Sequence, residues 1–342
     1  MAPENEGGTL AAPRPRARAL IETAADLAAV TALLEVAEEL GIFGELERGA
    51  VITAADLAAV AGTPVDGMAV FVKALAAAGL VTDAGRPGSV RVTEDFATLR
   101  TAAGYLSWAL KANRPFIENP LAFLRDSGAA AGTYRRDSRA VAVSSRWVGL
   151  REFYPATLSV MIDARPSRIA DLGAGAAGLL IDALGALPTA TGVALDISAA
   201  ACAVAADAAA RAGVADRLRV VQASIESIAD DPGPVAGADV IHSGFAFHDL
   251  AADAETFGAV LRGCREALAP EGFLLVTDAV PYSPDGRERM FSSLFSYLHE
   301  AFMNVRLPAE EEWCESFRAA GFKSVRSCPH RMPGARLFIA AT

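Results

Sequence analysis

The second half of the chain alternates short apolar runs with helical segments, and this alternation limits the possible folds more than any other feature of the sequence. Each run is rich in aliphatic residues, and Ala-rich or amphipathic segments separate the runs. The runs occupy 168–175, 190–197, 218–225, 238–247, 272–280 and 335–342. Because strands buried on both faces are apolar along their length, this pattern is typical of a parallel sheet covered by helices. The sequence therefore predicts an α/β domain of Rossmann-like architecture over 161–342.

A glycine-rich turn follows the first of these runs. Asp171 lies near the end of the strand, Gly173 and Gly175 form the turn, and the next helix follows. Glycines in such a turn let a ligand approach the backbone closely. About twenty residues further on, the second run ends in Asp196, whose carboxylate can accept hydrogen bonds from both hydroxyls of a ribose. The two elements together predict a site for a nucleoside-containing cofactor.

The acidic residue before the turn distinguishes between two kinds of cofactor. The segment Asp-Leu-Gly-Ala-Gly at 171–175 resembles the cofactor loop of the class I S-adenosylmethionine-dependent methyltransferases. This resemblance implies S-adenosylmethionine as the cofactor. It assigns the cofactor site to Asp171, Gly173, Gly175, Asp196, Ile197, Ser224, Ile225 and Ser243. Ser224 stands where the family commonly has Asp, and an NAD-binding Rossmann domain, which favours Gly-x-Gly-x-x-Gly, remains the alternative.

A mostly helical domain is predicted over 19–100, after a flexible N-terminus over 1–18. A helical stripe of apolar residues runs from 20 to 40, and Thr53 and Pro64 each open a short helix. The segment 80–93 is predicted to form two short strands around a Gly/Pro turn. Helix, helix and hairpin together resemble a winged helix. Since the second of these helices carries only Lys73 as a cation, we expect a dimerisation domain rather than a DNA-binding one.

Between these domains, 101–160 is expected to form a helical connector that contributes to the substrate cleft. It is rich in arginine and aromatic residues. Trp108 and Arg136 are its candidate substrate-binding residues, the second for a substrate carboxylate, and Phe295 is a third candidate from later in the chain.

Composition narrows the range of partners. A formal net charge of -10 and a pI of about 5.0 repel phosphate backbones, so we expect a small-molecule substrate and no nucleic acid. The four cysteines are scattered without Cys-x-x-Cys spacing, which favours reduced thiols over disulfides or a zinc ribbon. The sequence has no uninterrupted run of about 18 apolar residues, so we expect no membrane span. We therefore expect a cytoplasmic protein, and the helical domain predicts a homodimer.

A His-Asp pair, His248 and Asp249, directly follows the fourth run, at the edge of the sheet where open α/β folds bind ligands. In the small-molecule O-methyltransferases that this region resembles, a histidine in such a motif is the general base that takes the proton of a hydroxyl. Neutral imidazole suits this task, because its pKa lies near the operating pH. The resemblance also places an acidic residue that orients the base at Asp278. The family's later acidic partner is expected near 306–308, where no carboxylate stands.

A second histidine points to different chemistry. On a helix expected over 288–305, His299 shares an apolar face with Phe295 and is therefore expected to face the sheet edge that holds His248. This layout resembles the metal-dependent C-methyltransferases of 2-oxo acids such as phenylpyruvate, indolepyruvate and 4-methyl-2-oxovalerate. In that group two histidines hold iron or zinc, which implies His248 and His299 as metal ligands. The third ligand stays open between Asp249, Asp278 and Glu300.

Three functional hypotheses follow. The first is methylation of the β-carbon of a metal-chelated 2-oxo acid, a building block for an antibiotic or another secondary metabolite, with Asp249 or Asp278 taking the proton. The second is metal-independent O-methylation of a phenolic or polyketide-like hydroxyl, with His248 as the base. The third is a protein that keeps the fold and binds a ligand or DNA without turnover. The missing late carboxylate and the inward-facing His299 favour the first.

Overall fold

The computed structural model describes residues 15–282 and 289–342 of the 342-residue chain. The chain divides into two compact units, the first ending at Leu106 and the second running from Ser107 to Thr342. The division falls within helix α5 (Phe96–Ser107), so the chain passes from one unit to the other inside a helix.

The first unit combines helices with a small antiparallel sheet. Its elements are α1 (Pro15–Glu39), α2 (Phe43–Glu47), β1 (Ile52–Thr53), α3 (Ala54–Ala61), α4 (Val65–Ala77), β2 (Val81–Asp83), β3 (Ser89–Val92) and most of α5. Thr53 caps α3 as predicted, because its hydroxyl accepts from the backbone N–H of Asp56, whose carboxylate accepts from that of Thr53. β2 and β3 form the predicted hairpin. β1 adds a third strand on β3 that was not predicted, since two residues are too short to show an alternation.

The second unit begins with helices and continues with the alternating α/β region. The helices are the π-helix η1 (Trp108–Ala112), α6 (Arg114–Glu118), α7 (Pro120–Arg125), α8 (Ser127–Thr133), α9 (Ser138–Glu152) and α10 (Tyr154–Asp163). The α/β region comprises β4 (Arg168–Leu172), α11 (Gly178–Ala186), β5 (Thr191–Asp196), α12 (Ala199–Arg211), β6 (Leu218–Gln222), the 3-10 helices η2 (Ile225–Ala229), η3 (Gly233–Val235) and η4 (Phe247–Asp249), β7 (Ala238–Gly244), α13 (Ala254–Ala267), β8 (Leu268–Ala279), α14 (Arg289–Phe302), α15 (Glu310–Ala319), β9 (Ser324–Pro329) and β10 (Ala335–Ala341).

The sheet of the second unit has seven strands in the order β6-β5-β4-β7-β8-β10-β9. The strands from β6 to β8 are parallel, whereas β10 is antiparallel to both of its neighbours. The prediction of a parallel sheet was therefore wrong for its last part. The edge strand β9 was not predicted, because its sequence Ser-Val-Arg-Ser-Cys-Pro is polar and largely exposed.

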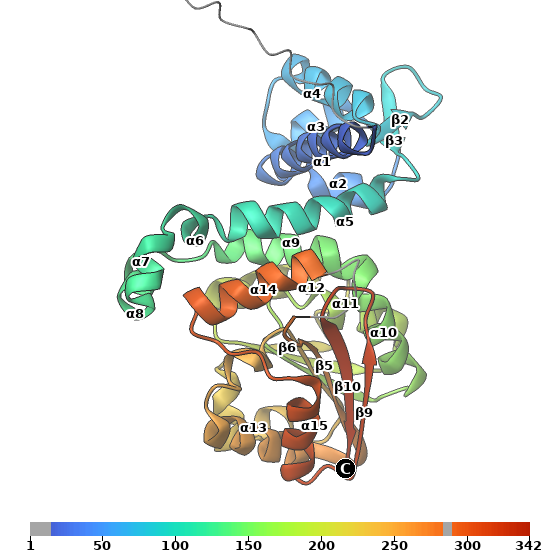
Figure 1. Cartoon of the computed structure of the whole chain (residues 1–342). Coiled ribbons are helices and arrows are strands. Elements are labelled where there is room, and N and C mark those ends of the chain that lie inside the picture. Colours follow the sequence, from blue (N-terminus) through green and yellow to red (C-terminus); the bar gives the residue numbers. More distant parts are fainter. Residues whose placement is uncertain (1–14, 283–288) are drawn as a thin grey trace, which may run out of the picture. The chain divides into compact units, whose positions relative to one another are not determined.

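Helices cover both faces of this sheet, as the second unit shows in Figure 1. One core lies between the sheet and α13 and α15, around Trp313 and Phe317. The other lies between the sheet and α10, α11 and α12, around Met161 and Leu180. The chain leaves β4 toward β5 on one side and returns to β7 on the other, which makes the carboxyl ends of β4 and β7 the point where ligands bind in such folds.

The helix expected over 288–305 is α14, which ends at Phe302; residue 288 lies outside the described residues. Among the described residues, no single helix has the length and apolar composition to cross a membrane. Helices α3 and α4 have that length and composition only when they are taken together, and the chain bends by 117° between them.

Candidate active site

A cavity of about 290 Å³ opens at the carboxyl ends of β4 and β7. The glycine loop after β4 forms one end, and aromatic residues of η1 and α14 form the other. Trp108, Phe291, Phe295 and His299 lie at the aromatic end, and Ser138, Val141, Ala142 and Ser145 line the wall that α9 provides. All of these residues belong to the second unit.

Two glycines with positive φ, Gly173 and Gly175, shape the loop after β4. Gly173 has φ of 70°, and a Cβ there would lie 2.8 Å from Cβ of Ala246, so only glycine fits. Gly175 has φ of 55°, and a Cβ there would meet no atom within 4 Å. The first glycine lets the loop pack on the chain after β7, and the second leaves open space at the mouth of the cavity.

Asp196 closes the loop from the neighbouring strand. Its Oδ2 accepts a hydrogen bond from the backbone N–H of Gly175 at 2.8 Å, and its Oδ1 accepts one from Ser198 at 2.8 Å. Each carboxylate oxygen can accept a second hydrogen bond, so both remain available to hydroxyls of a ribose. Next to it, Ile197 leaves 71% of its surface exposed, which suits a side chain that an adenine ring covers. These features fit the adenosine half of S-adenosylmethionine.

The other predicted cofactor residues lie in different surroundings. Ile225 borders the loop, with its Cδ1 3.3 Å from the Cβ position of Gly173, and Ser224 beside it is half-buried. Ser243 is fully buried and donates its hydroxyl hydrogen to the carbonyl of Leu172 at 3.1 Å. That hydroxyl ties β7 to β4 and does not line the cavity.

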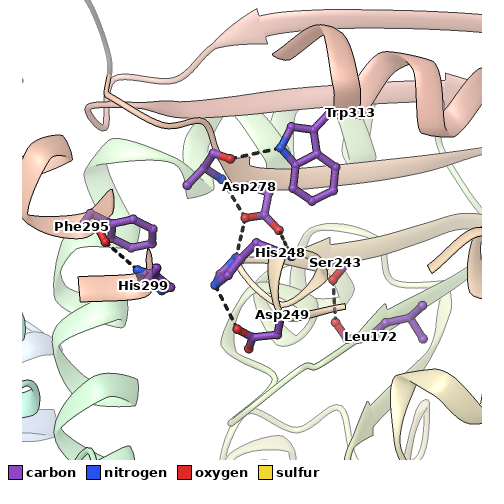
Figure 2. Close-up of polar contacts among 9 residues, drawn as sticks. Leu172, Ser243, His248, Asp249, Asp278, Phe295, His299 and Trp313 are labelled. Carbon is purple, nitrogen blue, oxygen red and sulfur yellow. Dashed lines mark hydrogen bonds and ion pairs between the residues drawn. The ribbon is translucent and has the colours of Figure 1, made fainter. Parts of the chain in front are cut away.

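His248 and Asp278 form a buried pair at the centre of the site, shown in Figure 2. Nδ1 of His248 lies 2.7 Å from Oδ1 of Asp278, and the backbone N–H of His248 donates to Oδ2 at 3.1 Å. Since the carboxylate can only accept, Nδ1 carries the hydrogen and Nε2 keeps the lone pair. Nε2 in turn lies 3.5 Å from Oδ1 of Asp249, which is half-exposed.

Burial lowers the pKa of His248, but the charge and hydrogen bond of Asp278, together with the charge of Asp249, outweigh it and leave the pKa raised above 6.5. The predicted His-Asp motif and its orienting carboxylate are therefore brought together by the fold.

His299 faces the same cavity, as predicted. Its ring centre lies 4.9 Å from that of His248, and it stacks on Phe295 at 4.1 Å. Its Nδ1 donates to the carbonyl of Phe295 at 2.7 Å, which leaves the lone pair on Nε2. Burial and the neighbouring His248 lower the pKa of His299 to about 2, so this imidazole is neutral at all ordinary pH values.

We next asked whether the side chains around His248 and His299 could complete a metal site. Neutral imidazole nitrogens are suitable ligands, but a catalytic metal site usually has three protein ligands. Asp278 has both oxygens engaged by His248, and Glu300 is exposed and does not line the cavity. Asp249 lines the cavity 3.5 Å from Nε2 of His248, but its side chain is 56% exposed. The described residues contain no group of three or more His, Cys, Asp or Glu that could hold a metal ion. The side chains present thus fit a complete iron or zinc centre poorly.

Arg136 reaches the cavity from the segment before α9, as the predicted connector implies. Its guanidinium has no hydrogen-bond partner among the described residues. Burial lowers its pKa and the nearby charge of Asp249 raises it, but a guanidinium remains a cation at neutral pH. Trp108, which stacks on Phe295 at 5.2 Å, also lines the cavity as predicted.

Three cavity residues, Phe153, Tyr154 and Thr157, were not predicted; they reach the cavity from the end of α9 and the start of α10. Phe245 has φ of 52°, a left-handed conformation unusual for an aromatic residue, directly after β7. The small residues of α9 recur at intervals of three and four, and this helical periodicity could have indicated a face packed against a ligand.

Comparisons with known proteins agree with this geometry. Residues 170–274 match the methyltransferase domain family. Aclacinomycin 10-hydroxylase RdmB of Streptomyces purpurascens is 36% identical over 111 residues, or 32% of this chain. The chain aligns with only 28% of the length of that relative.

Solved structures are similar over nearly the whole chain. The mitomycin 7-O-methyltransferase MmcR has a TM-score of 0.56 and 19% identity, with 95% of this chain and 96% of that chain covered. Human N-acetylserotonin methyltransferase, solved with S-adenosylmethionine, has a TM-score of 0.57 and 17% identity, with 98% and 99% covered. The chain therefore has the Rossmann-like α/β methyltransferase fold with an N-terminal helical domain, and its residues 170–274 match the methyltransferase domain family.

Proposed function

We propose that this protein is an S-adenosylmethionine-dependent O-methyltransferase that acts on a hydroxyl of an aromatic small molecule. The observation that carries the proposal is the pair of His248 and Asp278, which presents the lone pair of a buried imidazole to the cavity. The O-methyltransferases among the similar structures add support for oxygen as the acceptor atom. The domain alone would be weaker support, since the relative RdmB is named a hydroxylase.

Methyl transfer to a hydroxyl needs a base that removes the hydroxyl proton. S-adenosylmethionine, when bound, supplies an electrophilic methyl group on a sulfonium. Nε2 of His248 takes the proton of the acceptor hydroxyl, and the oxygen forms a bond to the methyl carbon while the carbon–sulfur bond breaks toward sulfur. Asp278 holds the imidazole in the required tautomer and stabilises the imidazolium that forms. S-adenosylhomocysteine and the methylated acceptor are the products.

The walls of the cavity indicate the kind of acceptor. Trp108, Phe291 and Phe295 stack or tilt against one another within 6.4 Å and offer flat apolar surface to an aromatic ring. Arg136, a cation without a hydrogen-bond partner among the described side chains, suits an acidic group on the same molecule. We infer a hydroxylated aromatic acid, or a similar polyketide-like compound, as the substrate class.

A substitution at the base tests this function. His248→Gln removes the basic nitrogen and keeps a polar side chain of similar size. We expect methyl transfer to fall by about 10²–10⁴-fold, while binding of S-adenosylhomocysteine, measured by calorimetry, stays within about twofold. Near-wild-type turnover in the variant would exclude His248 as the base.

A second candidate function is metal-dependent methylation of a 2-oxo acid carbon, which one observation favours. His299 places a second neutral imidazole 4.9 Å from His248, ring centre to ring centre, and O-methylation needs only one. The two functions differ in what His299→Leu does. O-methylation predicts nearly intact turnover and no bound metal in the purified protein, whereas C-methylation predicts about one equivalent of iron or zinc that the variant loses together with its activity.

A further inference from the structure

The cavity contains a second histidine–carboxylate pair, separate from His248 and Asp278. His242 on β7 and Asp171 on β4 are partners in the register of the parallel sheet. Nδ1 of His242 lies 2.7 Å from Oδ1 of Asp171, and because a carboxylate only accepts, Nδ1 donates the hydrogen. The two side chains are 5% and 6% exposed, and both residues line the cavity.

The proposed proton transfer does not use this pair. Along each strand, successive side chains point to opposite faces. Asp171 and His242 alternate with residues of the core under α13 and α15, so they lie on the face that α10, α11 and α12 cover. Asp278 is on the other face. The pair stands instead beside the glycine loop that begins at Gly173, close to where the cofactor enters the sheet edge.

His242 and Asp171 each have one polar side-chain atom without a hydrogen-bond partner among the described residues. Nε2 of His242 is fully buried and has no partner among the described residues. Oδ2 of Asp171 also has no hydrogen bond within the described part of the chain. The Asp171 side chain is 6% exposed and lines the cavity, so a ligand there can reach this oxygen. A carboxylate oxygen withdrawn from most of the solvent is unfavourable unless a donor meets it, and a cation with N–H groups is the strongest such donor.

S-adenosylmethionine carries one group of this kind. Its α-ammonium lies in the amino-acid part of the molecule, at the opposite end from the adenosine that Asp196 and Ile197 fit. Gly244 makes room for the imidazole, since a Cβ there would lie 3.2 Å from Cε1 of His242.

We propose that His242 is a positioning residue for the cofactor: its Nδ1–H fixes the carboxylate of Asp171 so that Oδ2 meets the α-ammonium group. The inference rests on the proposed function, because it requires this cofactor. His242 acts through Asp171 and contacts neither the transferred methyl group nor the acceptor.

Two ligands separate this role from a general effect on folding. S-adenosylhomocysteine carries the amino-acid part, whereas 5′-methylthioadenosine has the same adenosine and thioether without it. Calorimetry of both ligands with wild type, His242→Leu and His242→Asn forms the test, because Asn keeps an N–H near the position of Nδ1. We expect His242→Leu to weaken S-adenosylhomocysteine about tenfold, to leave 5′-methylthioadenosine within about twofold, and His242→Asn to recover most of the loss.

Matched variants complete the design. His330→Leu removes another buried histidine, which contacts Thr277 rather than Asp171, and should not change the ratio of the two affinities. In an Asp171→Asn background, His242→Leu should add no further loss. If the leucine variant does not fold, His242→Gln replaces it, since its amide reaches the position of Nε2 but not that of Nδ1.

The outcomes are distinct. Unchanged binding of S-adenosylhomocysteine by His242→Leu would overturn the inference, and so would a loss in His242→Asn as large as that in His242→Leu. A wild-type protein that binds neither ligand would overturn the proposed function, and the inference with it.

Discussion

At the scale of single residues, the ionisation of His248 decides when the site can work. Its pKa is raised above 6.5 because the charges of Asp278 and Asp249 outweigh burial. A base acts only when neutral, so turnover should increase with pH, and the midpoint of this increase should lie above pH 6.5.

Asp278→Asn tests the cause of that raised pKa. The substitution removes the largest influence that favours the protonated imidazole, so the acidic limb of the pH profile should move to lower pH. The maximal rate should fall by about 10²-fold or more, because the imidazole loses the partner that fixes its tautomer. A pH profile of kcat/KM measures both effects, and Glu300→Gln, on an exposed residue outside the cavity, is the control. An acidic limb that stays in place would contradict the assigned role of Asp278.

At the scale of elements, the packing of α13 on η2 depends on one glycine. A Cβ on Gly263 would overlap the carbonyl oxygen of Ile228, and a backbone carbonyl cannot move aside as a side chain can. We expect Gly263→Ala to lower the free energy of unfolding by about 1–3 kcal/mol. Gly185→Ala, on an exposed position of α11 with open space around it, should raise it by about 0.5–1 kcal/mol. Urea unfolding of both variants checks the pair, and equal effects would show that the helix contact does not matter.

The elements that the sequence predicts best are those whose signal is local. Strands β4 to β8 follow from continuous apolar runs, and the start of α3 follows from the cap at Thr53. β10 was predicted as a strand, but its antiparallel direction could not be, because strand direction is set by tertiary packing. The edge strand β9 could not be predicted because it is mostly polar.

In the site too, residues that belong to local motifs could be predicted, whereas contacts that depend on strand pairing could not. Asp196, His248 and Asp278 could be placed from motifs at strand ends, which meet at one edge of a parallel sheet. The hydrogen bond of His242 to Asp171 depends on the register between β4 and β7, which residue spacing does not give. Ser243 stays a predicted cofactor residue, and the bond from its hydroxyl to the carbonyl of Leu172 likewise depends on register, since the two residues are partners in the pairing of β4 with β7.

At the scale of the whole molecule, we propose a homodimer formed through the N-terminal unit. Leu20, Ile21 and Val36 on α1 are 70%, 60% and 44% exposed, and this apolar surface is what a partner chain would cover. Size-exclusion chromatography with light scattering should give twice the 35.5 kDa of one chain. Ile21→Glu should shift the mass toward that of a monomer, whereas Val204→Glu, on an exposed position of α12, should not. A wild-type protein with the mass of one chain would contradict the dimer.

The most direct test of the central claim is where the transferred methyl group goes. Wild type and His248→Gln are incubated with S-adenosylmethionine that carries a ¹³C-labelled methyl group and with a panel of hydroxylated aromatic acids and 2-oxo acids, and NMR correlations locate the label. The proposed function predicts a labelled methyl on oxygen of a hydroxylated aromatic acid, formed by wild type and lost in His248→Gln. A label on the carbon next to the keto group of a 2-oxo acid would contradict it.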